Sequence, residues 1–260
     1  IGKGAFSDLS SLSSVTFAEG SGLLSIGDNA FDSTSISSIE LPDTITNIGE
    51  SAFTKCRYLS SIDLPEALTS LGDSAFSGDS YISQVNIGKS LSSLGSNVFD
   101  SCTKLSSINV ASGNSSYTSD DGILFNSDKT SLIAYPAGKA GTDYDVPSSV
   151  VSVGDHAFAN NQKLENVTLP KGVETLGKYA FSKATKLQTL ELGNSLKSIG
   201  TLAFWNCSNL QSLTIPDTVT EIGSTAFYNC YDTKFYVYSE NVKQLVKSAG
   251  ASEDNITIID

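Results

Sequence analysis

The chain has 260 residues, of which 39% are hydrophobic and 17% charged, so it has enough apolar material for a folded core and is not disordered. Its formal net charge is −12 and Arg57 is its only arginine, so it offers a phosphate backbone no basic stripe, which excludes nucleic acid as an expected partner. No apolar run approaches the roughly 20 residues of a membrane-spanning helix, so we expect no membrane insertion of this chain.

A short pattern recurs from the first residue onward: an aliphatic residue, Gly, two variable residues, Ala or Val, and then Phe. It begins at Ile1, Ile26, Ile48, Leu71, Leu94, Val153, Leu176, Ile199 and Ile222. A period of about 23 residues over about nine copies is the signature of a solenoid, whose units bury their apolar side chains only by stacking on neighbours. Because the chain lacks Met and starts within the pattern, we expect it to be a piece of a longer protein.

Each copy continues into a short run in which hydrophobic and other residues alternate, as at Leu59, Ile62 and Leu64. A period of two residues predicts a strand with one face in the core. Proline follows this run in several copies, and its missing N–H would end the strand ladder there. These prolines are Pro42, Pro65, Pro170 and Pro216.

The glycine of each motif, for example Gly49, suits a tight corner with a positive φ or a close approach of two backbones. The next residue is often Asp, Glu, Ser or Thr, which suits a cap for a short helical turn that carries Ala and Phe inward. We therefore predict an α/β repeat solenoid. It would be a right-handed superhelix with a parallel β-sheet on the concave side and short helical turns on the convex side.

One insertion interrupts the period, near residues 111–152. It contains two apolar runs, within residues 117–125 and 132–136, on either side of the polar residues 126–129. Two such runs around a polar turn predict a β-hairpin.

The end of the chain also leaves the period. Val242, Leu245, Val246 and Ala249 mark one face of a helix that would begin near Ser239 and close at Gly250. We predict a solenoid of about nine repeats in residues 1–235 and a C-terminal cap, made of a helix and a short strand, in residues 236–260.

The repeat unit, nearly complete at Ile48 to Pro65 and at Ile199 to Pro216, resembles the BspA-like, or treponemal, class of leucine-rich repeats. The resemblance covers nearly the whole chain, and Asp121 to Phe125 and Tyr236 to Tyr238 resemble the hairpin and terminal cap of such proteins. It implies a surface or secreted bacterial protein, with members that adhere to host matrix proteins, cells or other bacteria. The motif consists of core and corner residues, so it is specific for fold and nearly silent about the ligand.

The strand residues that face away from the core are the main candidates for ligand binding. We call them the polar strip: Thr16, Glu40, Asp63, Asn86, Asn109, Thr168, Glu191 and Thr214. Such a strip on the concave wall suits hydrogen bonding to a protein or glycan over an extended area. Plain solvation of a half-buried sheet explains the same residues equally well.

Two aromatic pairs recur at a spacing of one unit: Tyr58 with Tyr81, and Trp205 with Tyr228. Each pair is expected to lie close enough to stack. Exposed aromatic rings can anchor a protein partner or lie against a sugar face. Local reinforcement of neighbouring coils is the competing interpretation, and it is the one we favour.

The residues that could carry other chemistry fit structural roles better. Cys56, Cys102, Cys207 and Cys230 share one position of the repeat without metal-ligand spacing, which favours packing, although Cys207 and Cys230 are close enough in the predicted stack to form a disulfide. The single histidine, His156, has no catalytic partners nearby, and the acidic residues around Gly122 fit a hairpin turn better than calcium binding. We assign no catalytic residue, metal or cofactor.

The predicted function is that of a cell-surface or secreted bacterial adhesion module, extracellular and monomeric, which recognises a host or bacterial surface protein or glycan. An alternative is a structural spacer that displays another domain of a longer surface protein. A third, a carbohydrate-active enzyme, needs only two carboxylates, and a chance pair among the 28 acidic residues keeps it open.

Overall fold

The structure is a computed structural model that describes residues 1–260. The chain forms two compact units. The N-terminal unit comprises Ile1–Asp128 and Tyr135–Lys139, and the C-terminal unit comprises Lys129–Ala134 and Ala140–Asp260.

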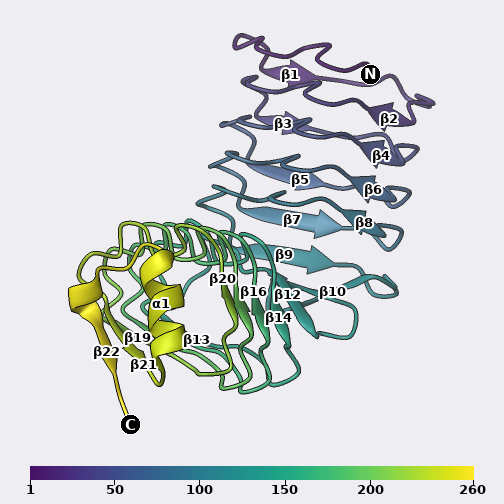
Figure 1. Cartoon of the computed structure of the whole chain (residues 1–260). Helices are drawn as coiled ribbons and strands as arrows, with labels where there is room; N and C mark the ends of the chain where they lie inside the picture. Colours follow the sequence, from purple (N-terminus) through teal and green to yellow (C-terminus); the bar gives the residue numbers. More distant parts are fainter. The chain divides into compact units, whose positions relative to one another are not determined.

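The N-terminal unit is a stack of coils that carries two columns of short strands (Figure 1). Strands one coil apart pair in parallel and in register, so that Ser61 lies opposite Gln84, and Gln84 opposite Ser107. The first column contains β1 (Ser14–Val15), β3 (Ser38–Ile39), β5 (Ser61–Asp63), β7 (Gln84–Ile87) and β9 (Ser107–Val110). The second column contains β2 (Ser25–Ile26), β4 (Asn47–Ile48), β6 (Ser70–Leu71) and β8 (Ser93–Leu94).

The C-terminal unit repeats both columns. Its first column contains β13 (Asp143–Asp145), β15 (Asn166–Thr168), β17 (Thr189–Glu191), β19 (Ser212–Ile215), β21 (Lys234–Val237) and β22 (Ile256–Ile258). Its second column contains β12 (Ser131–Ala134), β14 (Ser152–Val153), β16 (Thr175–Leu176), β18 (Ser198–Ile199) and β20 (Glu221–Ile222). The repeat solenoid is therefore confirmed, and the aliphatic residue of each motif lies in a second strand column that the sequence analysis did not predict.

The segment that carries Ala and Phe inward is a run of hydrogen-bonded turns rather than a helix. Asn29 and Ser33 have positive φ angles of 53° and 58°. From Asn29 to Ser33, the N–H of every second residue donates to a carbonyl of the next coil. Phe31 N–H, for example, donates to the Ala52 carbonyl at 2.8 Å. Backbone groups that a helix would satisfy internally thus join neighbouring coils.

The glycine of the motif lets the backbones of neighbouring coils approach closely. A Cβ placed on Gly49 would lie 2.5 Å from Asp28 Oδ1 and 2.6 Å from Asp28 N. The positive φ falls two residues later, at Ser51, and not on the glycine. Of the two reasons expected for this glycine, close approach is confirmed.

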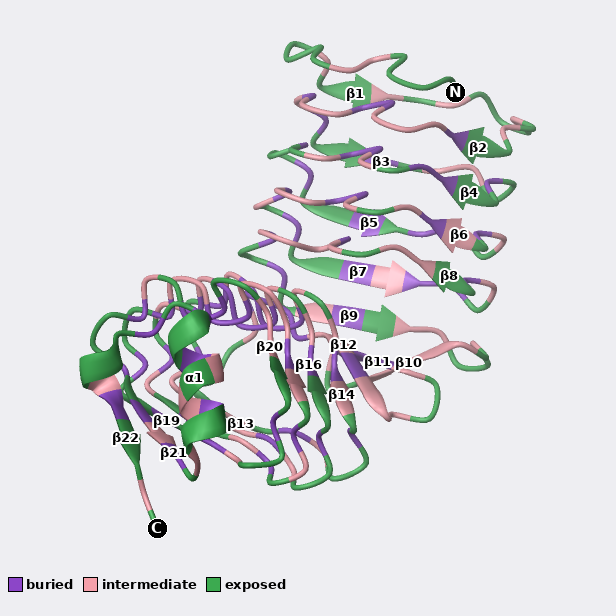
Figure 2. Ribbon diagram, in the orientation of Figure 1, coloured by how far each residue is buried: buried purple, intermediate pink, exposed green.

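The core is built from equivalent side chains that line up from coil to coil. In the N-terminal unit, the rings of Phe31 and Phe53 stack with centroids 5.2 Å apart, and those of Phe53 and Phe76 are 5.4 Å apart. An equivalent stack in the C-terminal unit is formed by Phe158, Phe181, Phe204 and Phe227. Buried and exposed residues alternate along strands such as β5 and β7 (Figure 2), as the period of two predicts.

The insertion contains an antiparallel hairpin, formed by β10 (Tyr117–Asp120) and β11 (Ile123–Asn126). Its turn residues, Asp121 and Gly122, have φ angles of 47° and 74°, the signature of a tight hairpin turn. The second apolar run of the insertion forms β12, which pairs in parallel with β14.

The predicted cap helix is α1 (Glu240–Ser248), and Gly250 follows it with a φ of 103°. The Ser239 hydroxyl caps the helix by accepting from Val242 N–H. Val242 and Val246 are fully buried, and a short 3-10 helix, η1 (Glu253–Asn255), leads into β22, which pairs with β21. The last coil is thus covered by the end of the chain.

Candidate functional site

The strand register places most of the polar strip where the sequence analysis expected it. Asp63, Asn86 and Asn109 occupy equivalent positions of β5, β7 and β9. Thr168 and Glu191 are paired likewise in β15 and β17. The strip is divided between the two compact units, with Thr16, Glu40, Asp63, Asn86 and Asn109 in the N-terminal unit and Thr168, Glu191 and Thr214 in the C-terminal unit.

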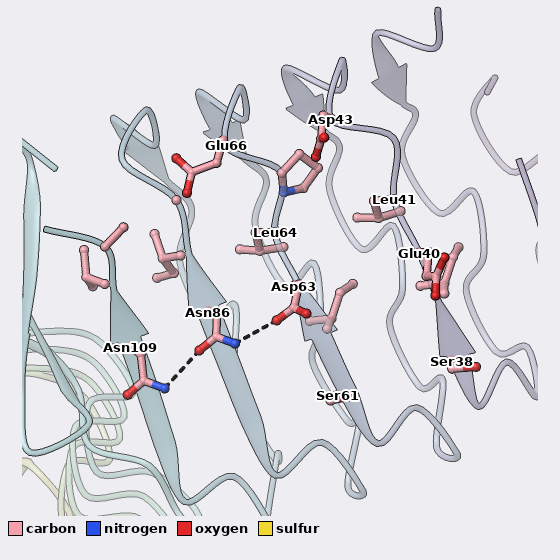
Figure 3. Close-up of a pocket in the computed structure, with 17 residues that line it drawn as sticks. Ser38, Glu40, Leu41, Asp43, Ser61, Asp63, Leu64, Glu66, Asn86 and Asn109 are labelled. Carbon is pink, nitrogen blue, oxygen red and sulfur yellow. Dashed lines mark hydrogen bonds between the residues drawn. The ribbon is translucent and has the colours of Figure 1, made fainter. Parts of the chain in front are cut away.

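All of the N-terminal part of the strip except Thr16 lines a groove of about 690 Å³, which we call the N-terminal groove (Figure 3). Three of its residues form a ladder of side-chain hydrogen bonds. Asn86 Nδ2 donates to Asp63 Oδ1 at 2.7 Å, and Asn109 Nδ2 donates to Asn86 Oδ1 at 2.9 Å. Gln84 Nε2 also donates to Asn86 Oδ1, at 2.9 Å, so the donors and acceptors of this ladder are largely used within the protein.

The rest of the N-terminal groove combines carboxylates with a hydrophobic floor. Glu40 is exposed and its carboxylate has no hydrogen-bond or ion-pair partner in the chain, while Asp43 and Glu66 lie on the loops that follow the strands (Figure 3). Leu41 and Leu64 lie between these carboxylates. Glu66 Oε2 accepts from Lys89 N–H at 3.3 Å. The groove therefore presents negatively charged hydrogen-bond acceptors at its rim, with apolar surface between them.

Glu191 and Thr214 of the strip, but not Thr168, line a second groove of about 770 Å³, which we call the C-terminal groove. Glu191 and Thr214 are exposed, and neither side chain has a hydrogen-bond partner in the chain. The groove also contains Asp217 and Tyr238, which the sequence analysis missed. The sequence analysis treated Tyr238 only as part of the cap, although its position directly after a strand of the first column would have indicated that it lines the groove.

A second ladder in the C-terminal unit was also missed. Asn166 Nδ2 donates to Asp143 Oδ1 at 2.7 Å, and the Thr189 hydroxyl donates to Asn166 Oδ1 at 2.6 Å. Hydrogen bonds from Thr142 and Asn166 lower the pKa of Asp143. The sequence does indicate the strand that begins this ladder, because Asp143 to Pro147 repeats the alternation and terminal proline of Ser61 to Pro65.

The predicted aromatic pair of the N-terminal unit is in contact. The rings of Tyr58 and Tyr81 lie 6.5 Å apart with an interplanar angle of 39°, so they are tilted rather than stacked. Lys104 Nζ lies 3.5 Å from the centre of the Tyr81 ring, a cation–π contact. Tyr58 is 60% exposed and Tyr81 50% exposed, so both rings remain available at the surface.

The second aromatic pair is arranged differently. Lys183 Nζ lies 4.9 Å from the centre of the Trp205 ring, while Tyr228 is half exposed. No ring contact joins Trp205 and Tyr228 in the described chain, so the expected stacking is not found for this pair. Equivalent positions on adjacent coils bring side chains near each other, but rotamers decide whether rings face.

The four cysteines are buried, free thiols, so Cys207 and Cys230 are not joined by a disulfide. Each Sγ donates to the carbonyl of the Phe on the preceding coil, at 3.0 to 3.1 Å. Burial raises the pKa of each thiol, to about 12 for Cys56 and about 11 for Cys230, which keeps them protonated. Their role is to satisfy a buried carbonyl from one coil to the next.

Asp79 occupies the same position of the repeat, between Cys56 and Cys102 on adjacent coils. It is fully buried, and neither carboxylate oxygen has a hydrogen-bond partner. Burial raises its pKa to about 9, against a smaller opposing effect of the Cys56 backbone. Asp79 is therefore a neutral acid at pH 7 in the folded protein.

The His156 ring stacks on Tyr179, with centroids 4.6 Å apart. No group of three or more His, Cys, Asp or Glu side chains is placed to hold a metal ion. None of the helices has the length and apolar character needed to span a bilayer.

Stacked parallel coils with two strand columns and an aligned phenylalanine core define a leucine-rich-repeat solenoid. Residues 1–106 and 137–257 match the family model described as BspA type leucine rich repeat region, with six copies. The chain belongs to this family. Comparison with curated proteins finds no match.

Solved structures of bacterial leucine-rich-repeat proteins are similar over most of the chain. The pneumococcal vaccine antigen PcpA is 26% identical with a TM-score of 0.69, over 91% of this chain and 77% of that one. A leucine-rich cell surface protein of Faecalibacterium prausnitzii has a TM-score of 0.74 at 24% identity, over 99% of this chain and 75% of that one, and shows the fold alone. A leucine-rich-repeat protein of Eubacterium ventriosum is 25% identical with a TM-score of 0.70, over 84% and 70%.

Proposed function

We propose that this chain is a binding module of a bacterial surface or secreted protein, used in adhesion, and that its first strand column carries the ligand site. Two grooves of about 690 and 770 Å³ support the proposal, because each is lined by residues of the first strand column of its unit. Grooves of this size lined by exposed polar groups suit recognition of an extended protein or glycan.

The observation that carries the proposal is the set of polar side chains in these grooves without an internal partner. Glu40 and Glu191 are exposed carboxylates with no ion pair or hydrogen bond in the chain, and each lines a groove. Solvation alone explains isolated acids, but acids that line a groove also present directed acceptors to a ligand. Two proteins of similar structure, a vaccine antigen and a cell surface protein, have names that agree with a surface location.

The proposal is tested by capture on an array of host matrix proteins and glycans. We expect Glu40→Lys and Glu191→Lys to weaken capture about tenfold while leaving the melting temperature unchanged, because exposed charges without internal partners contribute little to stability. Glu221→Lys, in β20 of the second column, and Glu50→Lys, just after β4, are matched controls on exposed acids outside both grooves, and they should capture normally. Unaltered capture by the groove variants would reject the first column as the site.

A structural spacer is the competing function. It predicts that the folded chain captures nothing on the same array, and that binding resides in another domain of a longer protein. A carbohydrate-active enzyme would instead release reducing ends from a polysaccharide, with turnover lost when a single carboxylate is replaced.

A further inference from the structure

The C-terminal groove has a feature that the N-terminal groove lacks, an exposed aromatic ring. Tyr238 lines the groove and is 46% exposed. Much of its ring therefore stays in water, and the fold gains correspondingly little from it. An aromatic face beside hydrogen-bonding groups is complementary to a sugar ring, which has an apolar face and a rim of hydroxyl groups.

The fold holds Tyr238 in a defined place. The register pairs Ile215 with Val237, so Tyr238 lies opposite Pro216, at the position where other coils end their strand with proline. The next residue, Ser239, caps α1 and also donates a hydrogen bond to Asp217 Oδ1. A ring attached to so constrained a backbone loses little conformational freedom when a ligand binds.

Polar groups from the two preceding coils lie along the same groove. Glu191 is in β17 and Thr214 in β19, and both side chains lack partners in the chain. Strands lie about 4.8 Å apart, and Tyr238 is two residues further along its strand than Tyr236, which pairs with Thr214. Glu191 and Tyr238 are therefore about 12 Å apart, which is more than a single sugar ring occupies. The arrangement fits an oligosaccharide that runs across the strands.

The charge of the groove narrows the ligand further. Glu191 and Asp217 line it, and no lysine or arginine does. Carboxylates accept hydrogen bonds from sugar hydroxyls, whereas they repel a carboxylated or sulfated glycan. A neutral saccharide is therefore the class that satisfies both the carboxylates and the aromatic ring.

We propose that the C-terminal groove binds a neutral oligosaccharide, with one sugar ring packed on Tyr238 and hydroxyl groups bound by Glu191 and Thr214. This inference rests on the proposed binding function and names the ligand class for one of its two grooves. Stacking on the Tyr238 ring is possible for different sugars, and hydrogen bonds to the Glu191 carboxylate would fix the orientation of the bound sugar.

The test is isothermal titration of the complete chain with cellohexaose, maltohexaose, chitohexaose and mannohexaose. At least one should bind, and Tyr238→Ala should weaken that binding about tenfold or more, because the stacking face is lost. Tyr238→Phe keeps the face and should retain most of the affinity. Tyr231→Ala is the matched control, because Tyr231 is 70% exposed but lies outside the groove.

Two results would overturn the inference: no binding of any of these oligosaccharides, or binding that Tyr238→Ala leaves unchanged. Should Tyr238→Ala lose the folded circular dichroism spectrum, Glu191→Gln combined with Thr214→Val tests the same groove at exposed positions and should weaken binding likewise. Capture of matrix proteins separates this inference from the broader proposal. Capture that depends on Glu40 but occurs without sugar binding leaves the binding module intact and removes only the oligosaccharide site.

Discussion

The two grooves lie on equivalent strand columns of the two units, yet their polar side chains are used differently. In the N-terminal unit, Asp63, Asn86 and Asn109 hydrogen-bond one another from coil to coil. In the C-terminal unit, Glu191 and Thr214 have no such partners. The position of a polar side chain in the column therefore does not determine whether it stabilises the fold or is free to bind a ligand. That depends on whether the side chain one coil away can form a hydrogen bond with it.

The chemistry of neighbouring pairs explains the difference. An amide placed one coil after a carboxylate can donate to it, as Asn86 does to Asp63 and Asn166 does to Asp143. Glu191 is followed by Thr214, and the two do not bond. The C-terminal unit keeps a ladder, but two residues earlier in each strand, where Thr189 donates to Asn166.

The cores of the two units are nevertheless built alike, and this gives the largest expected effect. Phe53 and Phe181 are both buried between two stacked rings. Phe53→Ala and Phe181→Ala should each lower the free energy of unfolding by about 3–5 kcal/mol, because each leaves a ring-sized cavity. Chemical denaturation measures both losses. A loss below about 1 kcal/mol in one unit alone would show that the cores are not equivalent.

The two units should differ, by a smaller change in stability, at the repeat position that the cysteines occupy. Asp79→Cys should stabilise the protein by about 2 kcal/mol at pH 7, because Asp79 has no hydrogen-bond partner and the flanking cysteines bond well at equivalent places. Asn161→Cys in the C-terminal unit should stabilise it less, because Asn161 Oδ1 already accepts from Lys163 N–H and Leu164 N–H at 2.9 and 2.8 Å, although its buried Nδ2 has no partner.

The Asp79 effect should depend on pH. The folded pKa of Asp79, about 9, lies above the ordinary value of 3.8, so the folded state holds the proton more tightly than the unfolded state. Stability contributed by this group is then complete at low pH and falls as pH rises from about 4 to about 9. The gain of Asp79→Cys in melting temperature should therefore be larger at pH 8.5 than at pH 5. An equal gain at both would mean that Asp79 is not held protonated.

The sequence alone predicted the parts of the fold that follow from the repeat: the strand at Ile62, the phenylalanine core, the hairpin turn at Gly122 and the capping helix after Ser239. These depend on hydrophobic periodicity and local turn chemistry, which a single sequence contains. The second strand column was missed because a strand of two residues, such as β4, is too short to show alternation.

The site was predicted less completely, for a physical reason. Register turns equivalent positions into columns, so Asp63, Asn86 and Asn109 could be placed together before their contacts were known. Whether two such side chains bond depends on rotamers and on their donors and acceptors. Tyr238 was missed because it belongs to the groove through its place opposite Pro216, while its sequence neighbours belong to the cap.

The most direct test of the difference between the grooves is the change in the free energy of unfolding caused by Asn86→Ala and by Glu191→Ala. The account predicts a loss of about 1 kcal/mol for Asn86→Ala, because the variant breaks the hydrogen-bond ladder, and a change within about 0.5 kcal/mol for Glu191→Ala. Equal losses for the two variants would contradict the claim that one side chain serves the fold and the other is free to bind a ligand.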